Sequence, residues 1–269
     1  MRMNTLISRS IVACLLAATS AAAFGAAAQE RTESATSRQD AHLDAAAVAA
    51  LERMSKALRG LPHFSLTSDA STEVVLQSGQ KIELDGQIRY EVEPPRRLFV
   101  DIKSDRAHRQ LFYDGNTLTL YSPRLKYYAS IDDVHASLRE LAGTLSTDYG
   151  IDLPLVDLFL WGTDAAPANV LTSAIYVGAG TLEGERVDHY AYQQPGADWQ
   201  VWISPSSFLP QKIVITSLDD PALPKYTARL KWDTTRAIAA ARYTFKPPPG
   251  SARITLVEID AVAVQTQEK

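Results

Sequence analysis

Apolar and polar residues alternate at every second position through most of the chain after Phe64, and this pattern decides the fold class. Leu98, Val100 and Ile102 alternate with polar neighbours, which is the period of a strand that buries one face. Asp114-Gly115 separates two such runs and predicts a tight hairpin. The sequence therefore predicts a mainly β protein with about twelve antiparallel strands. In the second half of the chain, the expected strands are 174–181, 186–194, 198–204, 210–218, 224–234, 241–246 and 252–264.

Three segments have the period of a helix instead. Residues 41–59 carry apolar side chains at three- and four-residue steps, with Asp40 placed to cap the start and Gly60 to mark the end. Residues 133–145 repeat the pattern. Residues 152–162 are apolar on nearly every side, whereas a surface helix needs only one apolar stripe. We expect the first helix to pack on the sheet and the other two to interrupt it.

A sheet of this size is expected to curl, because long flat edges promote aggregation. The expected fold is therefore α+β: a curled antiparallel sheet, or unclosed β-barrel, with an N-terminal helix and a helical lid. No linker, charge block or clear repeat interrupts the pattern. Residues 41–264 are expected to form a single domain, followed by a tail over residues 265–269.

The first 28 residues have the features of a secretory signal peptide. The apolar stretch after Arg9 is too short to span a membrane, and Ala26–Ala28 supply small residues for cleavage. Cys14 is the only cysteine, but most of the apolar stretch follows it, so lipid attachment there is not expected. The sequence predicts export to the periplasm, a disordered polar leader over residues 29–40 and no stable membrane span.

The charge balance argues against a nucleic-acid-binding protein. The chain has 27 Lys and Arg and 31 Asp and Glu residues. Two of the arginines and none of the acids lie in residues 1–28, so the exported part is more acidic than the whole. A nucleic-acid-binding domain would show a basic face instead.

The residues that could carry catalysis are few and scattered. None of the five histidines is four residues from another, and no His-Glu-x-x-His or Gly-x-Ser-x-Gly motif occurs. The paired acids Asp132-Asp133 and Asp219-Asp220 fall at turns or helix starts, where capping explains them. We therefore expect a non-enzymatic protein with no metal and no cofactor.

Two longer motifs resemble those of a known family. The first is a strand junction, Pro95-Arg96-Arg97-Leu98-Phe99, and the second is the hairpin Tyr113–Pro123, which reads YDGNTLTLYSP. Over residues 45 to 260 the chain resembles the periplasmic lipoprotein carriers LolA and LolB. The segment Tyr149–Leu155 and the apolar stretch after it are more specifically similar to a family of predicted periplasmic proteins of unknown function beside those carriers.

This resemblance implies an unclosed barrel whose apolar cavity accepts acyl chains under a helical lid. In the carriers, an arginine just before the junction proline helps to hold the lid. Here Glu93 and Pro94 precede Pro95, so Arg89 or Arg97 would have to replace that arginine. The resemblance therefore implies the apolar cavity of the carriers, whereas the arginine that holds their lid has no direct counterpart at this position.

The candidate ligand-binding residues are the apolar side chains of the lid and of the strands that face it. The ordinary alternative is that these residues only fill a core. The lid candidates are Leu153, Leu155, Phe159, Leu160 and Trp161, and the wall candidates are Val100, Ile102, Leu118, Leu120 and Trp202.

Two functions fit these features. The first is a periplasmic protein that binds or carries a hydrophobic or amphipathic ligand, such as a lipid or an acylated protein. The alternative is an interaction or sensor module of the cell envelope, which would use the same fold to hold a protein partner.

Overall fold

The computed structural model describes residues 42–160 and 170–258. The expected signal peptide, the leader, the Asp40 cap and the C-terminal tail lie outside the described residues, as do Trp161 and the expected helix end at Gly162. Every statement below concerns the described ranges.

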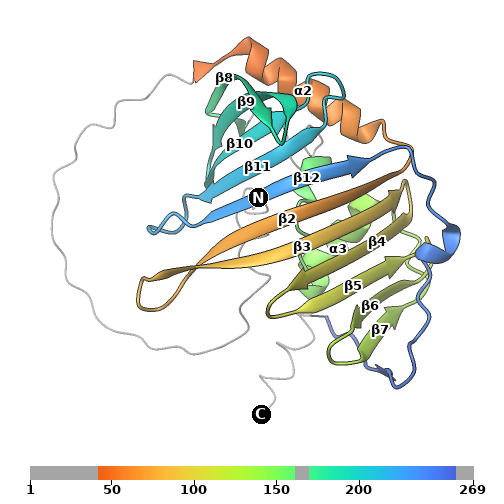
Figure 1. The fold of residues 1–269 in the computed structure, drawn as a ribbon. Coiled ribbons are helices and arrows are strands. Elements are labelled where there is room, and N and C mark those ends of the chain that lie inside the picture. The colour runs from red at the N-terminus through yellow and green to blue at the C-terminus, as the bar shows by residue number, and fades with distance from the viewer. Residues whose placement is uncertain (1–41, 161–169, 259–269) are drawn as a thin grey trace.

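The described strands form one 13-stranded sheet that curls without closing (Figure 1). All pairs within it are antiparallel except those of the two edge strands, β1 and β13, which contribute two residues each and pair in parallel. The expected fold class is confirmed. In spatial order the strands are β1 (His42–Leu43), β8 (Ser173–Leu182), β9 (Glu185–Gln194), β10 (Ala197–Ile203), β11 (Pro210–Ser217), β12 (Lys225–Asp233), β2 (Phe64–Val75), β3 (Lys81–Glu93), β4 (Arg97–Ser104), β5 (His108–Tyr113), β6 (Leu118–Ser122), β7 (Tyr127–Ile131) and β13 (Ala252–Arg253).

The first helix, α2 (Ala45–Arg59), begins four residues later than the sequence pattern suggests. His42 and Leu43 extend the sheet instead, and Asp44 accepts a hydrogen bond from the Ala46 amide at 2.8 Å, which caps the helix. The apolar stripe is buried as expected, and Leu51 is only 1% exposed. Tyr192 fastens the helix to β9, because its hydroxyl donates to the Ala47 carbonyl at 2.9 Å.

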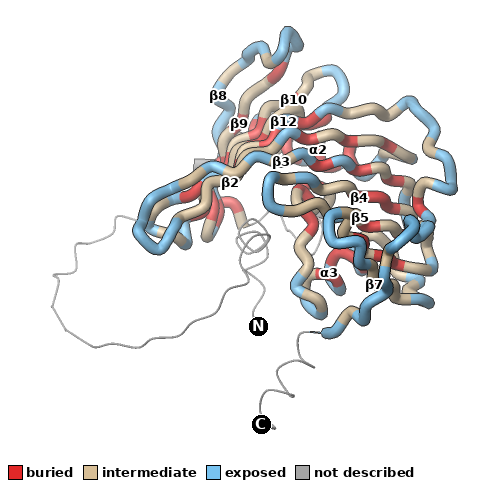
Figure 2. Tube along the Cα trace, turned by 60° about the horizontal axis from the view of Figure 1, so that its bottom comes forward, coloured by how far each residue is buried: buried red, intermediate tan, exposed pale blue. Residues whose placement is uncertain are grey.

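The second helix was expected at 133–145 but forms as α3 (Leu138–Tyr149). Asp133 and His135 have positive φ angles of 60° and 43°, which a right-handed helix excludes. Ser137 and Glu140 then form a reciprocal capping box that fixes the start of α3. The buried face of α3 joins the core on the concave side of the sheet (Figures 1 and 2).

The strand expected at 241–246 is absent from the structure, and this prediction is wrong. Residues Ala240–Arg242 form a short 3₁₀ helix, η2, and the chain crosses the outer face of the sheet. Phe245 lies there 5.1 Å from the ring centroid of Tyr121 and 5.2 Å from that of Phe112. The last expected strand, 252–264, is reduced to β13 within the described residues.

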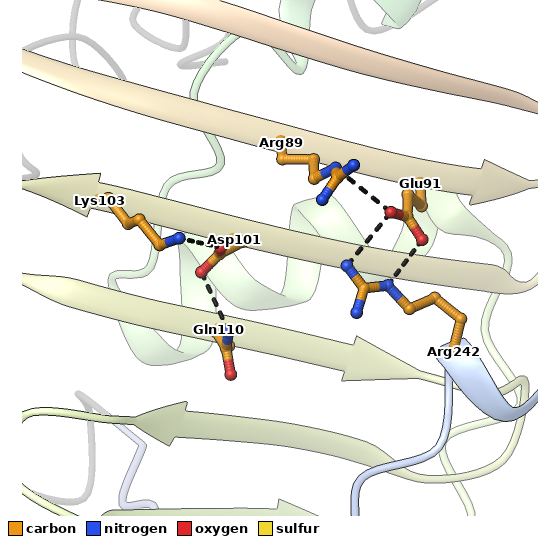
Figure 3. A network of polar contacts seen from close by, with 6 residues as sticks. All are labelled: Arg89, Glu91, Asp101, Lys103, Gln110 and Arg242. Atoms are coloured by element: carbon orange, nitrogen blue, oxygen red, sulfur yellow. Dashed lines mark hydrogen bonds and ion pairs between the residues drawn. The ribbon is translucent and has the colours of Figure 1, made fainter. Parts of the chain in front are cut away.

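A polar network covers the outer face of β3, β4 and β5 (Figure 3). Arg242 reaches back from η2 to Glu91, with an Nε–Oε2 distance of 2.6 Å, and its guanidinium lies 3.8 Å from the ring centroid of Phe99. Asp101 accepts a hydrogen bond from Gln110 and lies 3.2 Å from the Lys103 ammonium. The C-terminal segment is therefore held to the sheet by charge and by aromatic packing together.

Replacing Asp101 with asparagine should lower the free energy of unfolding by about 1–3 kcal/mol at neutral pH. Burial opposes ionisation of Asp101, but hydrogen bonds from His108, Gln110 and Lys103 outweigh it and hold its pKa below the ordinary value of 3.8. The stabilisation is therefore complete above the unfolded-state pKa and is lost as the pH falls through the lower folded-state pKa. Urea unfolding across this pH range measures the effect. The exposed Asp69, replaced in the same way, should change the free energy by less than about 0.5 kcal/mol, and an equal loss in both variants would contradict the prediction.

Candidate functional site

A cavity of about 190 Å³ lies between the concave face of the sheet and the segment after α3. Its wall comes from strands far apart in the sequence, and its cover comes from residues 151–158. The lining is mainly apolar. The apolar lining residues are Met54, Ala70, Leu84, Ile88, Ile102, Ala107, Leu111, Leu120, Ile151, Leu153, Pro154, Leu155, Leu158, Trp199, Ile213, Ile215 and Tyr226.

The cavity has one end at the surface. Its lining residues Asp105, Arg106 and Arg109, which belong to the β4–β5 hairpin, are exposed, whereas the lining residues Met54 of α2 and Leu158 of the cover are buried. An apolar chain that entered from the hairpin would therefore reach the space below α2 and the lid.

Small residues in the middle of the sheet leave room for this cavity. Ala228 of β12 lies beside Ala70 of β2, Ala70 lies beside Gly86 of β3, and Gly86 lies beside Ser104 of β4. At Gly86, a Cβ atom would lie 2.9 Å from the carbonyl oxygen of Lys103, so the backbones approach too closely there for a side chain. We call these four positions the small-residue row, and three of them, Ala70, Gly86 and Ser104, line the cavity.

The cover of the cavity is an irregular segment and not the long helix expected at 152–162. In the described part of that stretch, which ends at residue 160, only α4 (Asp157–Leu160) is helical, and Leu155 before it has a φ of 65°. A bulky side chain rarely adopts this left-handed conformation, so contacts with the rest of the protein have to hold it. We call residues Ile151–Leu160 the lid segment.

Two contacts fix the lid segment to the sheet. The hydroxyl of Tyr90 donates a hydrogen bond to the carbonyl of Pro154. Phe159 stacks on Phe64 with ring centroids 5.3 Å apart and an interplanar angle of 15°, and Trp232 meets both rings. The lid segment is thus held at its middle and at its end.

The candidate latch arginines do not make these contacts. Arg89 pairs with Glu91 at 3.3 Å, and Arg97 pairs with Glu93 at 3.2 Å. Both pairs lie on the side of β3 opposite to Tyr90 in the alternation of the strand. A tyrosine hydroxyl and an aromatic stack hold the lid where the resemblance implies an arginine.

The structure brings four of the expected ligand-binding residues to the cavity: Leu153, Leu155, Ile102 and Leu120. Val100 and Leu118 are on the same face of the sheet but are fully packed in the core, at 0% and 2% exposed. Phe159 packs in the aromatic stack beside the cavity. The described part of the structure does not include the side chain of Leu160 or any of Trp161.

Trp202 lies on the outer face of β10, away from the cavity. Its ring stacks on His189 at 4.0 Å, and the Lys212 ammonium lies 4.5 Å from its centroid. Burial beside this ring lowers the pKa of His189 most, and the charge of Lys212 lowers it further, whereas the hydrogen bond that His189 Nε2 donates to Gln200 Oε1 opposes the shift. These contacts account for Trp202 without a ligand.

Trp199 lines the cavity in place of Trp202, and sequence reasoning did not single it out for this role. The two tryptophans are three positions apart on one strand, so their side chains must lie on opposite faces. The alternation of buried residues at Ala197, Trp199, Val201 and Ile203 identifies the inner face. That spacing was the signal that could have separated them.

The described residues contain no cluster of three or more His, Cys, Asp or Glu side chains that could ligate a metal ion. None of the helices in the described ranges has both the length and the apolarity needed to cross a membrane.

Solved structures with similar folds have low sequence identity to this chain. A chain of the Pseudomonas aeruginosa MucA/MucB complex is 15% identical with a TM-score of 0.41, and the match covers 75% of this chain and 62% of that one, less than two-thirds of its length. The Mycobacterium tuberculosis lipoprotein LppX is 12% identical with a TM-score of 0.44, and the match covers 72% of this chain and 98% of LppX. LprF from Mycobacterium bovis is 14% identical with a TM-score of 0.43, covering 78% and 99%. No curated protein matches the chain.

A family model gives the decisive match. The model described as "Predicted periplasmic protein (DUF2092)" matches residues 47–257, which is most of the chain. The description agrees with the family and with the periplasmic location expected from the sequence. This chain therefore belongs to the DUF2092 family of predicted periplasmic proteins.

Proposed function

We propose that this protein is a non-enzymatic periplasmic binding protein that encloses the apolar part of a lipid or of an acylated protein. The observation that supports this function best is the apolar cavity between the small-residue row and the lid segment. Burial of a ligand's apolar surface would supply the affinity, at about 25 cal/mol per Å² before the costs of ordering.

The size of the cavity implies that the lid moves when a ligand enters. Binding sites for small molecules commonly measure about 300–1,000 Å³, and this cavity holds about 190 Å³. It accommodates part of an acyl chain as it stands, and a longer chain requires the lid segment to shift outward. The left-handed Leu155 and the two lid contacts are the features that would change in this opening.

Native mass spectrometry of protein purified from the periplasm, followed by organic extraction, tests the proposal. A co-purifying lipid or acylated peptide, or stoichiometric uptake of added lipid, is the expected result. A protein that stays at its bare mass and takes up no lipid would overturn the proposal.

Replacing Phe159 with alanine should speed the exchange of a bound apolar probe by about tenfold, because the loss of one aromatic stack removes about 0.5–1.5 kcal/mol from lid closure. Stopped-flow fluorescence of a bound naphthylamine dye measures the exchange. Tyr127, which is an aromatic residue 46% exposed on β7, gives the matched control when replaced by alanine. Equal exchange rates in both variants would show that Phe159 does not hold the lid.

The alternative function, binding of an envelope protein partner, is favoured by one feature of the sheet edge. Within the described residues, β1 pairs with only Ser173 and Ala174 of β8. The next three residues of β8 are each more than 40% exposed, namely Ile175, Tyr176 and Val177. An exposed strand edge of this kind can accept an extended peptide as a further strand. A charged substitution at Val177 that abolished binding to a partner, while lipid uptake was absent, would favour this alternative.

A further inference from the structure

We infer that the ligand carries an anionic group and that Arg109 binds this group at the open end of the cavity. The inference rests on the proposed function and specifies its ligand as an apolar chain that ends in a carboxylate or phosphate. It depends on the placement of one arginine in a wall that is mainly apolar.

Arg109 belongs to the inner face of β5. Its register partner on β4 is Ile102, and the next inward position along β5 is Leu111. All three residues line the cavity. The side chain therefore starts from the wall of the cavity, and Arg109 is exposed to solvent.

The guanidinium of Arg109 has no bonding partner among the described residues: it forms no hydrogen bond or ion pair there. The other arginine at this end, Arg106, also lies in the lining and is likewise without a bonding partner in the described part of the chain. In contrast, Arg124 is engaged, since it donates to the carbonyls of Asp105 and Ser104 at 2.7 and 3.0 Å and so fixes the hairpin that carries Arg106.

Carboxylates near the opening do not neutralise Arg109 through an ion pair. Asp85, Asp105 and Asp152 all belong to the lining. Asp85 alternates with the inward Leu84 and Gly86, so its side chain starts from the outer side of β3. Asp152 of the lid segment accepts a hydrogen bond from Ser146 at 2.6 Å. Asp105 lies in the hairpin turn itself. Within the described residues, Arg109 forms no ion pair with any of the three.

The chemistry of this arrangement fits an acyl anion. A guanidinium presents parallel N–H donors that match a carboxylate or phosphate, and such charge-assisted pairs are stronger than neutral hydrogen bonds. The apolar cavity behind Arg109 would take the hydrocarbon chain. The ordinary role of an arginine at such a place is to cover apolar wall with its methylene stem, and the experiment separates the two roles.

The experiment compares binding of a fluorescent polyene fatty acid with that of its methyl ester, at a pH where the acid is ionised. The parent protein should bind the acid about tenfold more tightly than the ester, since one charge-assisted pair has this effect. Arg109→Met keeps the apolar stem, so it should bind acid and ester equally and the ester as tightly as the parent. Arg186→Met, at an exposed position of β9 outside the cavity, should retain the preference.

Each other outcome identifies what fails. Equal binding of acid and ester by the parent protein would overturn the inference and leave the apolar container intact. A preference that persists in Arg109→Met would overturn the assignment to Arg109. Failure to bind either probe, with lipid also absent from native mass spectra, would overturn the proposed function itself. Competition by a lysophosphatidic acid and by a free fatty acid then distinguishes phosphate from carboxylate as the preferred head group.

Discussion

Replacing Ala70 with phenylalanine should weaken the binding of apolar probes by at least about tenfold. Ala70 is one of the two inner members of the small-residue row and lines the cavity. A large ring at this position would occupy the space that we assign to the ligand, because its neighbour Gly86 has no side chain and its neighbour Ala228 has only a methyl group. Titration of the protein with a naphthylamine dye measures the loss.

Thermal unfolding of the Ala70 variant distinguishes a filled cavity from a damaged core. Overpacking of a well-filled core costs about 1–3 kcal/mol, so a fall in Tm would indicate that little space was free. Ser71→Phe places the same ring on the outer face of β2 and should leave dye binding unchanged. Ala70→Leu provides a smaller filler if the phenylalanine variant does not fold. Undiminished dye binding by a folded Ala70 variant would contradict the placement of the ligand.

Replacing Leu51 with alanine should destabilise the protein by about 2–5 kcal/mol, which is the usual cost of removing a buried leucine. Leu51 is 1% exposed on the inner side of α2 and belongs to the same core cluster as the cavity wall residues Ile88 and Trp199. Urea unfolding of the parent protein and of the variant measures the change in the free energy of unfolding. Its direct neighbour Glu52 is exposed, and Glu52→Ala should change stability by less than about 0.5 kcal/mol.

The Leu51 result also bears on whether α2 is a permanent part of the core. A loss near 1 kcal/mol or less would mean that α2 leaves the sheet at little cost. In that case a ligand could enter the cavity beside Met54 when α2 moves away, and the lid segment would not be the element that controls entry. The larger loss of stability that we expect for this variant would indicate that α2 is a fixed wall of the cavity.

Local patterns were sufficient to predict the strands before residue 132. The alternation of Leu98, Val100 and Ile102 and the turn at Asp114-Gly115 each depend on neighbours in the sequence, and β4, β5 and β6 follow from them. The helix at 133–145 was misplaced because the left-handed Asp133 and His135 are held by tertiary contacts. One of these is the hydrogen bond from the Val134 amide to the Asn116 carbonyl, at 2.9 Å.

The candidate site was less accessible to sequence reasoning because its position depends on register between distant strands. Ala228, Ala70 and Gly86 are ordinary small residues in the sequence, and only the pairing of β12, β2 and β3 places them in one row. Arg109 could not be identified from the sequence for the same reason, because only the pairing of β5 with β4 shows that it shares the inner face with Ile102 and Leu111. The segment at 241–246 was misassigned as a strand because Phe245 packs on outer-face aromatics that periodicity does not reveal.

The pairing of β12 with β2 also governs when this protein can fold. These two strands lie side by side at the middle of the sheet, yet one is near the start of the exported chain and the other near its end (Figure 1). Contacts between such distant segments require a long loop to close, which slows folding. The centre of the sheet has no partner for β2 on its β12 side until residues Lys225–Asp233 have crossed the membrane. The order of strands therefore delays completion of the sheet, and with it of the cavity whose wall includes β2 and β12, until the late strand β12 is available.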